Sequence, residues 1–330
     1  MKILLVDLEF DYGQESRGIN PIRAYGYQAA MESLGNSVET FFYDQYLNDT
    51  DTLQKKVLKA AEDSQPDLIF FILFKNQFLT QTLDHLKKKF KTINWFGDDT
   101  WRFDNFTSKY ANHFTYCVTT DKFSIKKYKA LGINNVIRSQ WAAIEKVEDI
   151  KFSGQYKYDV SFVGAYNPAR AWFVQELAKN NITVECFGFG WPNGSVDNKE
   201  MNSIFRHSKI SLNLSNSVNY NLRYLLCSPK NLIHTLRSRK TASQIKARNF
   251  EVPYAGGFQL SDYTPSIEDY FTIGQEIACY STLDDAVTQI QYFLKNNEER
   301  ESIREKAHQL ARNSHGYSHR LEKIFKGLGL

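Results

Sequence analysis

The 330-residue sequence lacks the features of several classes of protein. Its four cysteines, Cys117, Cys186, Cys227 and Cys279, form no CxxC pair and no Cys/His ligand spacing, so neither a zinc site nor a disulfide framework is predicted. No stretch approaches the run of about 18 apolar residues that a membrane-spanning helix needs. The apolar run at the amino terminus ends at Asp7 and is too short for a signal peptide. We therefore expect a cytoplasmic protein with reduced thiols.

The sequence also lacks a large excess of positive or negative charge. Lys and Arg number 41 and Asp and Glu number 37, which gives a formal net charge of +4. We therefore expect no nucleic acid partner. One local cluster, Lys87-Lys88-Lys89-Phe90-Lys91, could bind an anionic membrane from the cytoplasmic side. The alternative is a solvated helix face.

The length and composition are those of two folded domains. A chain of 330 residues is long for one core, and 42% hydrophobic residues are enough for two. The stretch 142–158 is polar and without apolar rhythm, so it is the expected linker. We predict an amino-terminal domain over 1–145, a carboxy-terminal domain over 156–312, and a terminal helix over 313–330 that packs back on the first domain.

Apolar runs alternate with helical patterns along the chain. This βαβ alternation predicts an α/β fold with two doubly wound, Rossmann-like parallel sheets. Thr282 and Asp285 form a capping-box pattern at the start of an amphipathic helix over 281–294. The expected strands cover residues 3–6, 38–43, 67–74, 92–96, 116–119, 136–137, 158–164, 184–189, 209–214 and 258–260.

The loop after the first strand is rich in charged residues. Glu9, Asp11 and Arg17 lie between that strand and a helix expected to start at Asn20-Pro21. Such a loop lies at the carboxyl edge of a parallel sheet, where α/β proteins bind ligands. These three residues are therefore candidates for contact with an acceptor. The alternative is a solvated connection.

Two adjacent acidic residues follow the strand at 92–96. Asp98 and Asp99 lie near Trp101, where partial desolvation could let one carboxylate act as a general base. Neighbouring residues leaving a strand point in opposite directions, so we expect Asp98 to be the base and Asp99 to cap the next turn or pair with Arg102. The pair lacks the intervening residue of a DxD motif, and no metal is predicted. The alternative is a helix cap with an acidic first turn.

A glycine-bearing turn follows the strand at 158–164. Gly164 precedes a helix that has Arg170 near its start, an arrangement that suits a diphosphate because the helix amino terminus attracts anions. The alternative is an ordinary strand-to-helix turn with Asn167 as the cap and Pro168 in the first turn.

A basic insertion lies between Ser217 and Lys240, and it is either a lobe that faces acceptor or phosphate or a surface excursion. Its basic residues are Arg223, Lys230, Arg237, Arg239 and Lys240.

The run that follows combines cations, a carboxylate and glycines. A short helix is expected to end near Pro253, which would place Glu251 at a helix-loop junction. Lys246 and Arg248 precede Glu251 and could bind phosphates, while the carboxylate could bind sugar hydroxyls. Gly256 and Gly257 would let the backbone approach a ligand closely.

The run RNFEVPYAGGFQLSD at 248–262 resembles the carboxy-terminal nucleotide-sugar motif of GT-B glycosyltransferases, especially the family related to the spore-maturation protein CgeB. In GT-B retaining enzymes with an E-x7-E motif, the second glutamate usually holds the donor ribose. Glu251 matches that position, Gly256 matches the glycine that follows, and Ser243 stands in place of the first glutamate.

The resemblance implies a GT-B fold, with two Rossmann-like domains facing a cleft. It implies a glycosyltransferase that uses a nucleotide-sugar donor, needs no cofactor or metal, and acts on a glycan, lipid-linked or protein acceptor in cell-surface polysaccharide or glycoconjugate assembly. The second domain would hold the donor, and Asp98 or Asp99 of the first would face the acceptor hydroxyl. A nucleotide-sugar epimerase and a non-catalytic nucleotide-sugar-binding protein are the alternatives.

Overall fold

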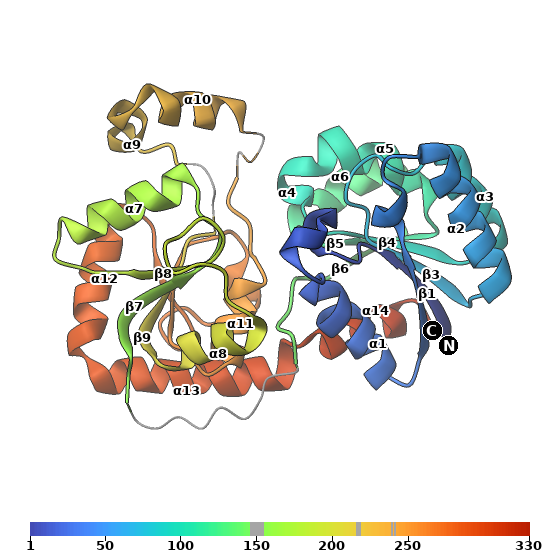
Figure 1. The fold of residues 1–330 in the computed structure, drawn as a ribbon. Helices are drawn as coiled ribbons and strands as arrows, with labels where there is room; N and C mark the ends of the chain where they lie inside the picture. The colour runs from blue at the N-terminus through green and yellow to red at the C-terminus, as the bar shows by residue number, and fades with distance from the viewer. Residues whose placement is uncertain (146–154, 216–218, 239, 241) are drawn as a thin grey trace. The chain divides into compact units, whose positions relative to one another are not determined.

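The computed structural model describes residues 1–145, 155–215, 219–238, 240 and 242–330. The chain divides into two compact units, the first formed by Met1–Glu145 with Tyr317–Leu330 and the second by Lys146–Gly316 (Figure 1). Residues 146–154 of the predicted linker lie outside the described residues. Ala142 at the start of that stretch is fully buried in the core of the first unit.

The first unit is built on a six-stranded parallel sheet with the order β2-β1-β3-β4-β5-β6. Its central strands are short apolar runs with both faces covered, as is typical of parallel sheets. The strands are β1 (Lys2–Asp7), β2 (Ser37–Phe42), β3 (Leu68–Phe71), β4 (Thr92–Phe96), β5 (Tyr116–Thr119) and β6 (Val136–Arg138).

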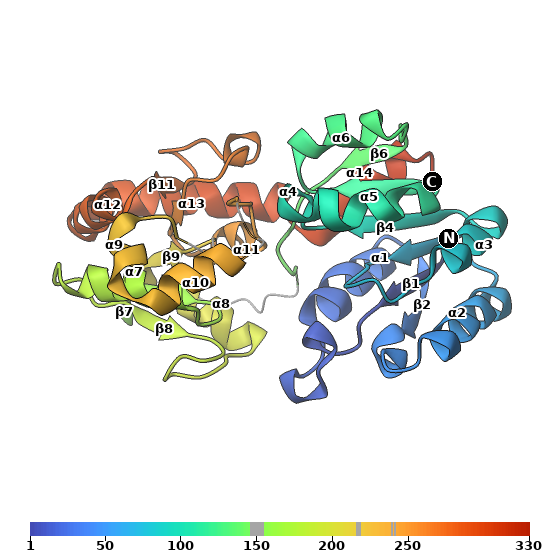
Figure 2. The same ribbon diagram turned by 90° about the horizontal axis from the view of Figure 1, so that it is seen from above.

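Helices cover both faces of this sheet. The carboxy-terminal helix α14 lies beside α1, and the ring of Tyr317 packs 5.0 Å from the ring of Tyr27 (Figures 1 and 2). A Cβ at Gly26 would lie 2.9 Å from the Tyr317 ring, so this contact requires glycine. The helices are a π-helix (Ile22–Gln28) that continues into α1 (Ala29–Ser33), α2 (Thr50–Ser64), α3 (Thr80–Lys89), α4 (Asp99–Arg102), α5 (Ser108–Tyr110), α6 (Ile125–Ala130) and α14 (Tyr317–Gly327).

The second unit has a five-stranded parallel sheet with the order β11-β10-β9-β7-β8. The edge strand β11 was not predicted from the sequence. The strands are β7 (Tyr158–Val163), β8 (Glu185–Phe187), β9 (Ser208–Asn213), β10 (Gln259–Asp262) and β11 (Ala278–Tyr280).

The helices of the second unit form two layers and a separate pair. Core residues of α7 and α12 share one cluster with the sheet, and those of α8 and α11 share another. The predicted capping box is present, since the Asp285 amide donates to Thr282 Oγ1 and the Ser281 amide donates to the Asp285 carboxylate. The helices are α7 (Pro168–Ala178), α8 (Asn198–Arg206), α9 (Leu222–Cys227), α10 (Pro229–Arg237), α11 (Arg248–Tyr254), α12 (Leu283–Lys295) and α13 (Asn297–Ser314).

None of the helices built from the described residues combines the length and apolarity that crossing a membrane requires.

Candidate functional site

The direction of the strand order in the second unit reverses between β7 and β9. Open α/β sheets bind ligands beyond the carboxyl ends of the strands at such a point. Arg170 lies there, because its Nη2 donates to the carbonyl of Leu214 (2.8 Å), which follows β9, and its Nη1 donates to the carbonyl of Ala165 (2.8 Å), which follows β7. The predicted cation therefore sits at the crevice between the two strand ends.

A pocket of about 360 Å³ opens at the same edge of the sheet. Asp262 lies in its wall, where it accepts a hydrogen bond from the Ser215 amide (2.9 Å). Burial raises the pKa of Asp262, while the Ser215 bonds and Arg170 lower it. A pocket with a guanidinium, a carboxylate, amides and phenol rings can bind a polar ligand that carries a flat ring. Its walls are formed by Ala169, Arg170, Phe173, Leu214, Asn219, Tyr220, Asn221, Ser243, Asp262, Tyr263, Tyr280, Ser281, Thr282 and Leu283.

Both backbone polar groups of Gly164 are hydrogen-bonded within the second unit. Its amide donates to the Phe187 carbonyl (2.8 Å), and its carbonyl accepts the indole N–H of Trp191 (2.9 Å). At the start of α7, Asn167 Oδ1 accepts the Arg170 amide (2.9 Å), and Pro168 occupies the first turn. The cap and the proline are those of the ordinary strand-to-helix turn that the sequence offered as the alternative, and binding of a diphosphate at the start of α7 stays a prediction.

Glu251 lies inside α11 and not at a helix-loop junction, because the helix continues through Pro253. Its carboxylate pairs with Arg248 one turn earlier, with Arg248 Nη1 2.9 Å from Glu251 Oε2. Burial raises the pKa of Glu251 and Arg248 lowers it. The amide of Lys246 donates to the side chain of Asn249 (3.0 Å) just before the helix.

The start of α11 lies near the carboxyl edge of the sheet. Asn249 Nδ2 donates to Ser261 Oγ (3.1 Å), which also accepts from Asn213 Nδ2 at the end of β9 (3.1 Å). This buried cluster places the predicted donor residues Lys246 and Arg248 at the same edge as Arg170. The backbone positions of these three cations therefore share one edge of the sheet. The Arg248 guanidinium itself reaches α8, where Nη1 lies 2.6 Å from Met201 Sδ and the group stacks 5.1 Å from the centre of the Phe205 ring.

Gly256 and Gly257 lie at the opposite end of α11. Gly256 has a φ of 81° and follows the helix as its left-handed cap, with its amide bonded to the Pro253 carbonyl. A Cβ at Gly257 would lie 2.8 Å from the Phe205 carbonyl oxygen, just before β9 begins. Both glycines are therefore needed for helix ending and close packing at the amino edge of the sheet. Their predicted approach to a ligand was wrong.

In the first unit, Asp98 and Asp99 have different environments. Asp98 is partly exposed, and its carbonyl accepts the amides of the first turn of α4. Asp99 is 1% exposed and accepts hydrogen bonds from Thr107 (2.6 Å), Thr119 (2.6 Å) and Tyr128 (2.8 Å). Burial raises the pKa of Asp99 to about 6, and the three hydroxyl bonds lower it. Because the Asp99 carboxylate is buried and accepts three hydrogen bonds, it cannot contact the hydroxyl of an acceptor substrate.

The expected partners of Asp99 were also wrong. Arg102 Nη2 donates to the Phe74 carbonyl (2.9 Å), and its guanidinium stacks 3.9 Å from the centre of the Phe106 ring. The hydroxyls that hold Asp99 come from three separate elements, so local sequence could not have shown them.

The predicted acceptor residues of the first loop are held within that loop or by its neighbours. Arg17 Nη2 lies 2.7 Å from Asp11 Oδ2, and the Arg17 guanidinium stacks on the Tyr12 ring. The Glu9 amide donates to the Asp44 carboxylate (3.0 Å), and the Glu9 carboxylate accepts from Gln45 (3.1 Å). The loop lies beyond β1, next to the point where the strand order of this sheet reverses.

Asp7 and Asp262 were not among the predicted site residues. Each is the last residue of a strand, which is the signal that could have identified it. Asp7 is 2% exposed, and burial raises its pKa to about 8, while the Leu8 amide and Arg23 lower it. Within the described residues, no group of three or more His, Cys, Asp and Glu side chains is arranged to hold a metal ion.

Comparison with known proteins identifies the architecture. Residues 170–326 match a family model described as glycosyl transferase-like. No curated protein sequence matches the chain. Sucrose-phosphate synthase from Thermosynechococcus elongatus superposes over 99% of both chains with a TM-score of 0.68 and 7% identity. The chain has the GT-B fold.

Two further GT-B structures cover both units of the chain. HepE from Anabaena, solved in complex with UDP and glucose, has a TM-score of 0.61 and 11% identity over 100% of this chain and 99% of its own. A putative UDP-N-acetylglucosamine 2-epimerase from Listeria monocytogenes has a TM-score of 0.58 and 10% identity over 99% of this chain and 95% of its own. The predicted α/β fold of GT-B type is confirmed.

Proposed function

We propose that the chain is a glycosyltransferase that moves a sugar from a nucleotide-sugar donor to an acceptor hydroxyl. The observation that carries the proposal is the match of residues 170–326 to a glycosyl transferase-like family in a chain with the GT-B fold. The UDP complexes of HepE support a nucleotide-sugar donor. The run at 248–262 supports a relationship to the CgeB-related family.

The donor would bind at the carboxyl edge of the second sheet. Glu251 would accept the ribose hydroxyls, and Arg170, Lys246 and Arg248 would face the diphosphate. Negative charge grows on the diphosphate as the glycosidic bond breaks, and cations fixed in advance stabilise that charge in the transition state. The cluster of Asn213, Asn249 and Ser261 fixes the start of α11 and thus the position of these groups.

The acceptor would bind to the first unit, with Asp98 as the general base. Asp98 lies at the carboxyl end of β4 and is partly exposed, whereas Asp99 is buried behind it. The acceptor would be a hydroxyl of a glycan, a lipid-linked sugar or a protein. No cofactor is proposed, and the three cations of the donor site would replace a divalent metal.

An epimerase that acts on a nucleotide sugar is the second candidate, because the Listeria protein shares the fold. It would consume the donor without an added acceptor. A non-catalytic binding protein would leave the donor unchanged. Chromatography of donor incubated with the chain, with and without acceptor, separates the three functions.

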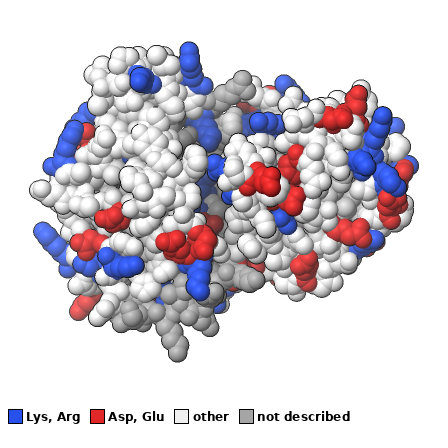
Figure 3. Space-filling view, in the orientation of Figure 1, with Lys and Arg blue, Asp and Glu red and all other residues white. Residues whose placement is uncertain are grey.

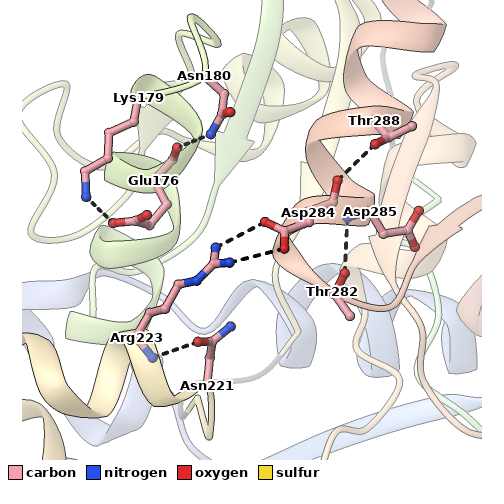
Figure 4. Close-up of polar contacts among 9 residues, drawn as sticks. All are labelled: Glu176, Lys179, Asn180, Asn221, Arg223, Thr282, Asp284, Asp285 and Thr288. Atoms are coloured by element: carbon pink, nitrogen blue, oxygen red, sulfur yellow. Dashed lines mark hydrogen bonds and ion pairs between the residues drawn. The ribbon is translucent and has the colours of Figure 1, made fainter.

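The first test is a thermal-shift screen against UDP-, GDP-, dTDP- and CMP-sugars. A ligand at about 100 times its dissociation constant should stabilise the fold by about 2.7 kcal/mol. Arg170→Lys should reduce the shift caused by the matching nucleoside diphosphate, because lysine lacks the forked geometry of the guanidinium. Lys179→Gln at the other end of α7 is the control, since Lys179 is exposed and pairs with Glu176 on its own helix (Figure 4). If no nucleotide sugar shifts the transition, the proposal is wrong.

A further inference from the structure

The helices α9 and α10 form a lobe of the second unit, residues 219–238, that projects from the α7 side (Figure 1). Most of their aliphatic side chains are exposed. Three leucines are among the most exposed large hydrophobic residues described, with exposed fractions of 71% for Leu222, 83% for Leu226 and 76% for Leu236. Leu232 and Ile233 are exposed by 43% and 47%. A contiguous set of this kind marks an interaction surface.

The opposite side of α9 is buried against the body of the unit, and that of α10 is buried against α9 and the base of the lobe. Tyr224 of α9 is fully buried and its ring packs 5.5 Å from Trp172, while Thr235 of α10 is 5% exposed. Arg223 reaches from α9 to Asp284 at the start of α12, with Nη1 3.2 Å from Oδ1 (Figure 4). The lobe is therefore anchored in an orientation that directs its leucines into solvent.

The charges around the leucines all have one sign. Residues 201–250 contain no Asp or Glu, although the whole chain is nearly balanced. The lobe itself carries Arg223, Lys230 and Arg237, and Lys240 follows it. In Figure 3 the top of the second unit shows white and blue atoms, and a small red group lies beside blue atoms at its left edge lower down.

We propose that this lobe binds the surface of an anionic lipid membrane. Aliphatic side chains on short amphipathic helices enter the boundary between headgroups and acyl chains, and nearby Lys and Arg are attracted to the lipid phosphates. The combination of protruding leucines and a net positive charge matches that environment. An apolar partner protein would not require the charge.

The lysine cluster of α3, which the sequence suggested for the same purpose, lacks the apolar component. Lys89 pairs with Glu62 (2.8 Å), and Lys87 donates to the Asn112 carbonyl (2.7 Å). Leu83 and Leu86 of the same helix are buried. This surface has charge but no aliphatic side chains from α3 to insert.

The base of the lobe contributes Asn219, Tyr220 and Asn221 to the wall of the pocket. Binding to lipid does not depend on sugar transfer, so the failure of this proposal and the failure of the proposed function are separate outcomes.

The experiment is sedimentation of the full chain with vesicles of phosphatidylcholine alone and with vesicles of phosphatidylcholine and phosphatidylglycerol in equal parts. We expect binding to the anionic vesicles that weakens with salt. The double variant Leu226→Ser/Leu236→Ser should weaken it about tenfold or more, because it removes apolar area that enters the bilayer. Lys230→Gln/Arg237→Gln should weaken binding to anionic vesicles by about an order of magnitude.

Two matched controls test the location of the surface. Leu131→Ser removes an exposed leucine (40%) of the first unit, and Lys87→Gln/Lys88→Gln removes charge from α3. Both should bind like the unchanged chain, and circular dichroism should show that all variants are folded. Failure of the unchanged chain to bind either kind of vesicle overturns the proposal. So does full binding by the lobe variants.

A second copy of the chain is the competing occupant of the leucine surface. Sedimentation velocity at rising protein concentration detects it. Self-association that Leu226→Ser/Leu236→Ser abolishes, together with an absence of vesicle binding, would assign the surface to a dimer and overturn the membrane proposal.

Discussion

Arg248 Nη1 lies 2.9 Å from Glu251 Oε2, one turn away on α11. Both side chains are largely buried, with 22% and 11% of their area exposed. Because the guanidinium favours the charged carboxylate against the effect of burial, the pair presents a hydrogen-bond acceptor next to a cation. This is the combination that a ribose with an attached diphosphate needs.

Glu251→Gln should weaken donor affinity roughly ten- to a hundredfold. The change removes charge-assisted hydrogen bonds worth about 1.5 to 3 kcal/mol while keeping the shape of the side chain. Calorimetric titration with the nucleotide sugar found in the screen measures the effect.

A matched control for Glu251 is present in α13, where Glu301 pairs with Arg304 at the same helical spacing and 2.7 Å. Glu301→Gln should leave donor affinity unchanged. Equal losses in the two variants would show that any lost ion pair in this unit disturbs binding, and the assignment of Glu251 to the ribose would then be wrong.

Asp98→Asn should lower turnover by about 10²- to 10⁴-fold while donor affinity stays near that of the unchanged chain. The reason is that a general base acts in the transition state and not in donor binding. Steady-state kinetics with varied donor measure both quantities. Full turnover in this variant would place the base elsewhere, with Glu9 and Asp11 next to be tested.

Asp99→Asn should act on stability. It removes the charged acceptor of the three buried hydroxyl bonds, which should cost about 1.5 to 3 kcal/mol of unfolding free energy. Urea unfolding of the two Asn variants separates the roles: Asp98→Asn should unfold like the unchanged chain, and Asp99→Asn at lower urea.

Activity should survive the removal of divalent metal. Arg170, Lys246 and Arg248 can offset the charge of the leaving diphosphate. Turnover with EDTA, and with EDTA followed by excess manganese, is the measurement. Activity that EDTA abolishes and manganese restores would contradict the proposed role of the three cations.

Asp7 should make the unfolding free energy fall as pH rises. Burial raises its pKa from 3.8 to about 8, so the folded state binds a proton that the unfolded state has lost over that range. The contribution is complete below about pH 4 and is lost as pH rises through about 8. Asp99, with a pKa of about 6, gives a similar fall that ends earlier.

Asp7→Asn keeps an oxygen for the Leu8 amide but removes the titration. The fall in unfolding free energy between about pH 6 and 8 should therefore be smaller in this variant, as urea unfolding across the range would show. The exposed Glu15→Gln serves as the control. An identical pH profile in Asp7→Asn and the unchanged chain would rule out this source of pH dependence.

The sequence by itself determined ten of the eleven strands that the described residues form in the two sheets, and their order along the chain. The apolar runs at 92–96 and 116–119 coincide with β4 and β5, because a strand buried on both faces needs continuous apolar residues and helices that cover both faces. The capping box at Thr282 could also be predicted from the sequence, because all the residues that form its hydrogen bonds lie within one helical turn. Strand patterns and helix caps depend on residues that are close in the sequence, so the sequence alone is enough to predict them.

The tertiary structure alone decided which side chains meet. Asp98 and Asp99 are adjacent residues of the same type. Asp99 is the one that is buried, because hydroxyl groups from three other elements donate hydrogen bonds to its carboxylate. Gly256 and Gly257 stand close to Glu251 in the sequence but lie at the other end of α11, because a helix separates its ends by about 1.5 Å per residue. The segment of α9 and α10 was identified from the sequence only as a basic insertion, and the packing of Tyr224 against Trp172 helps to leave Leu222, Leu226 and Leu236 exposed.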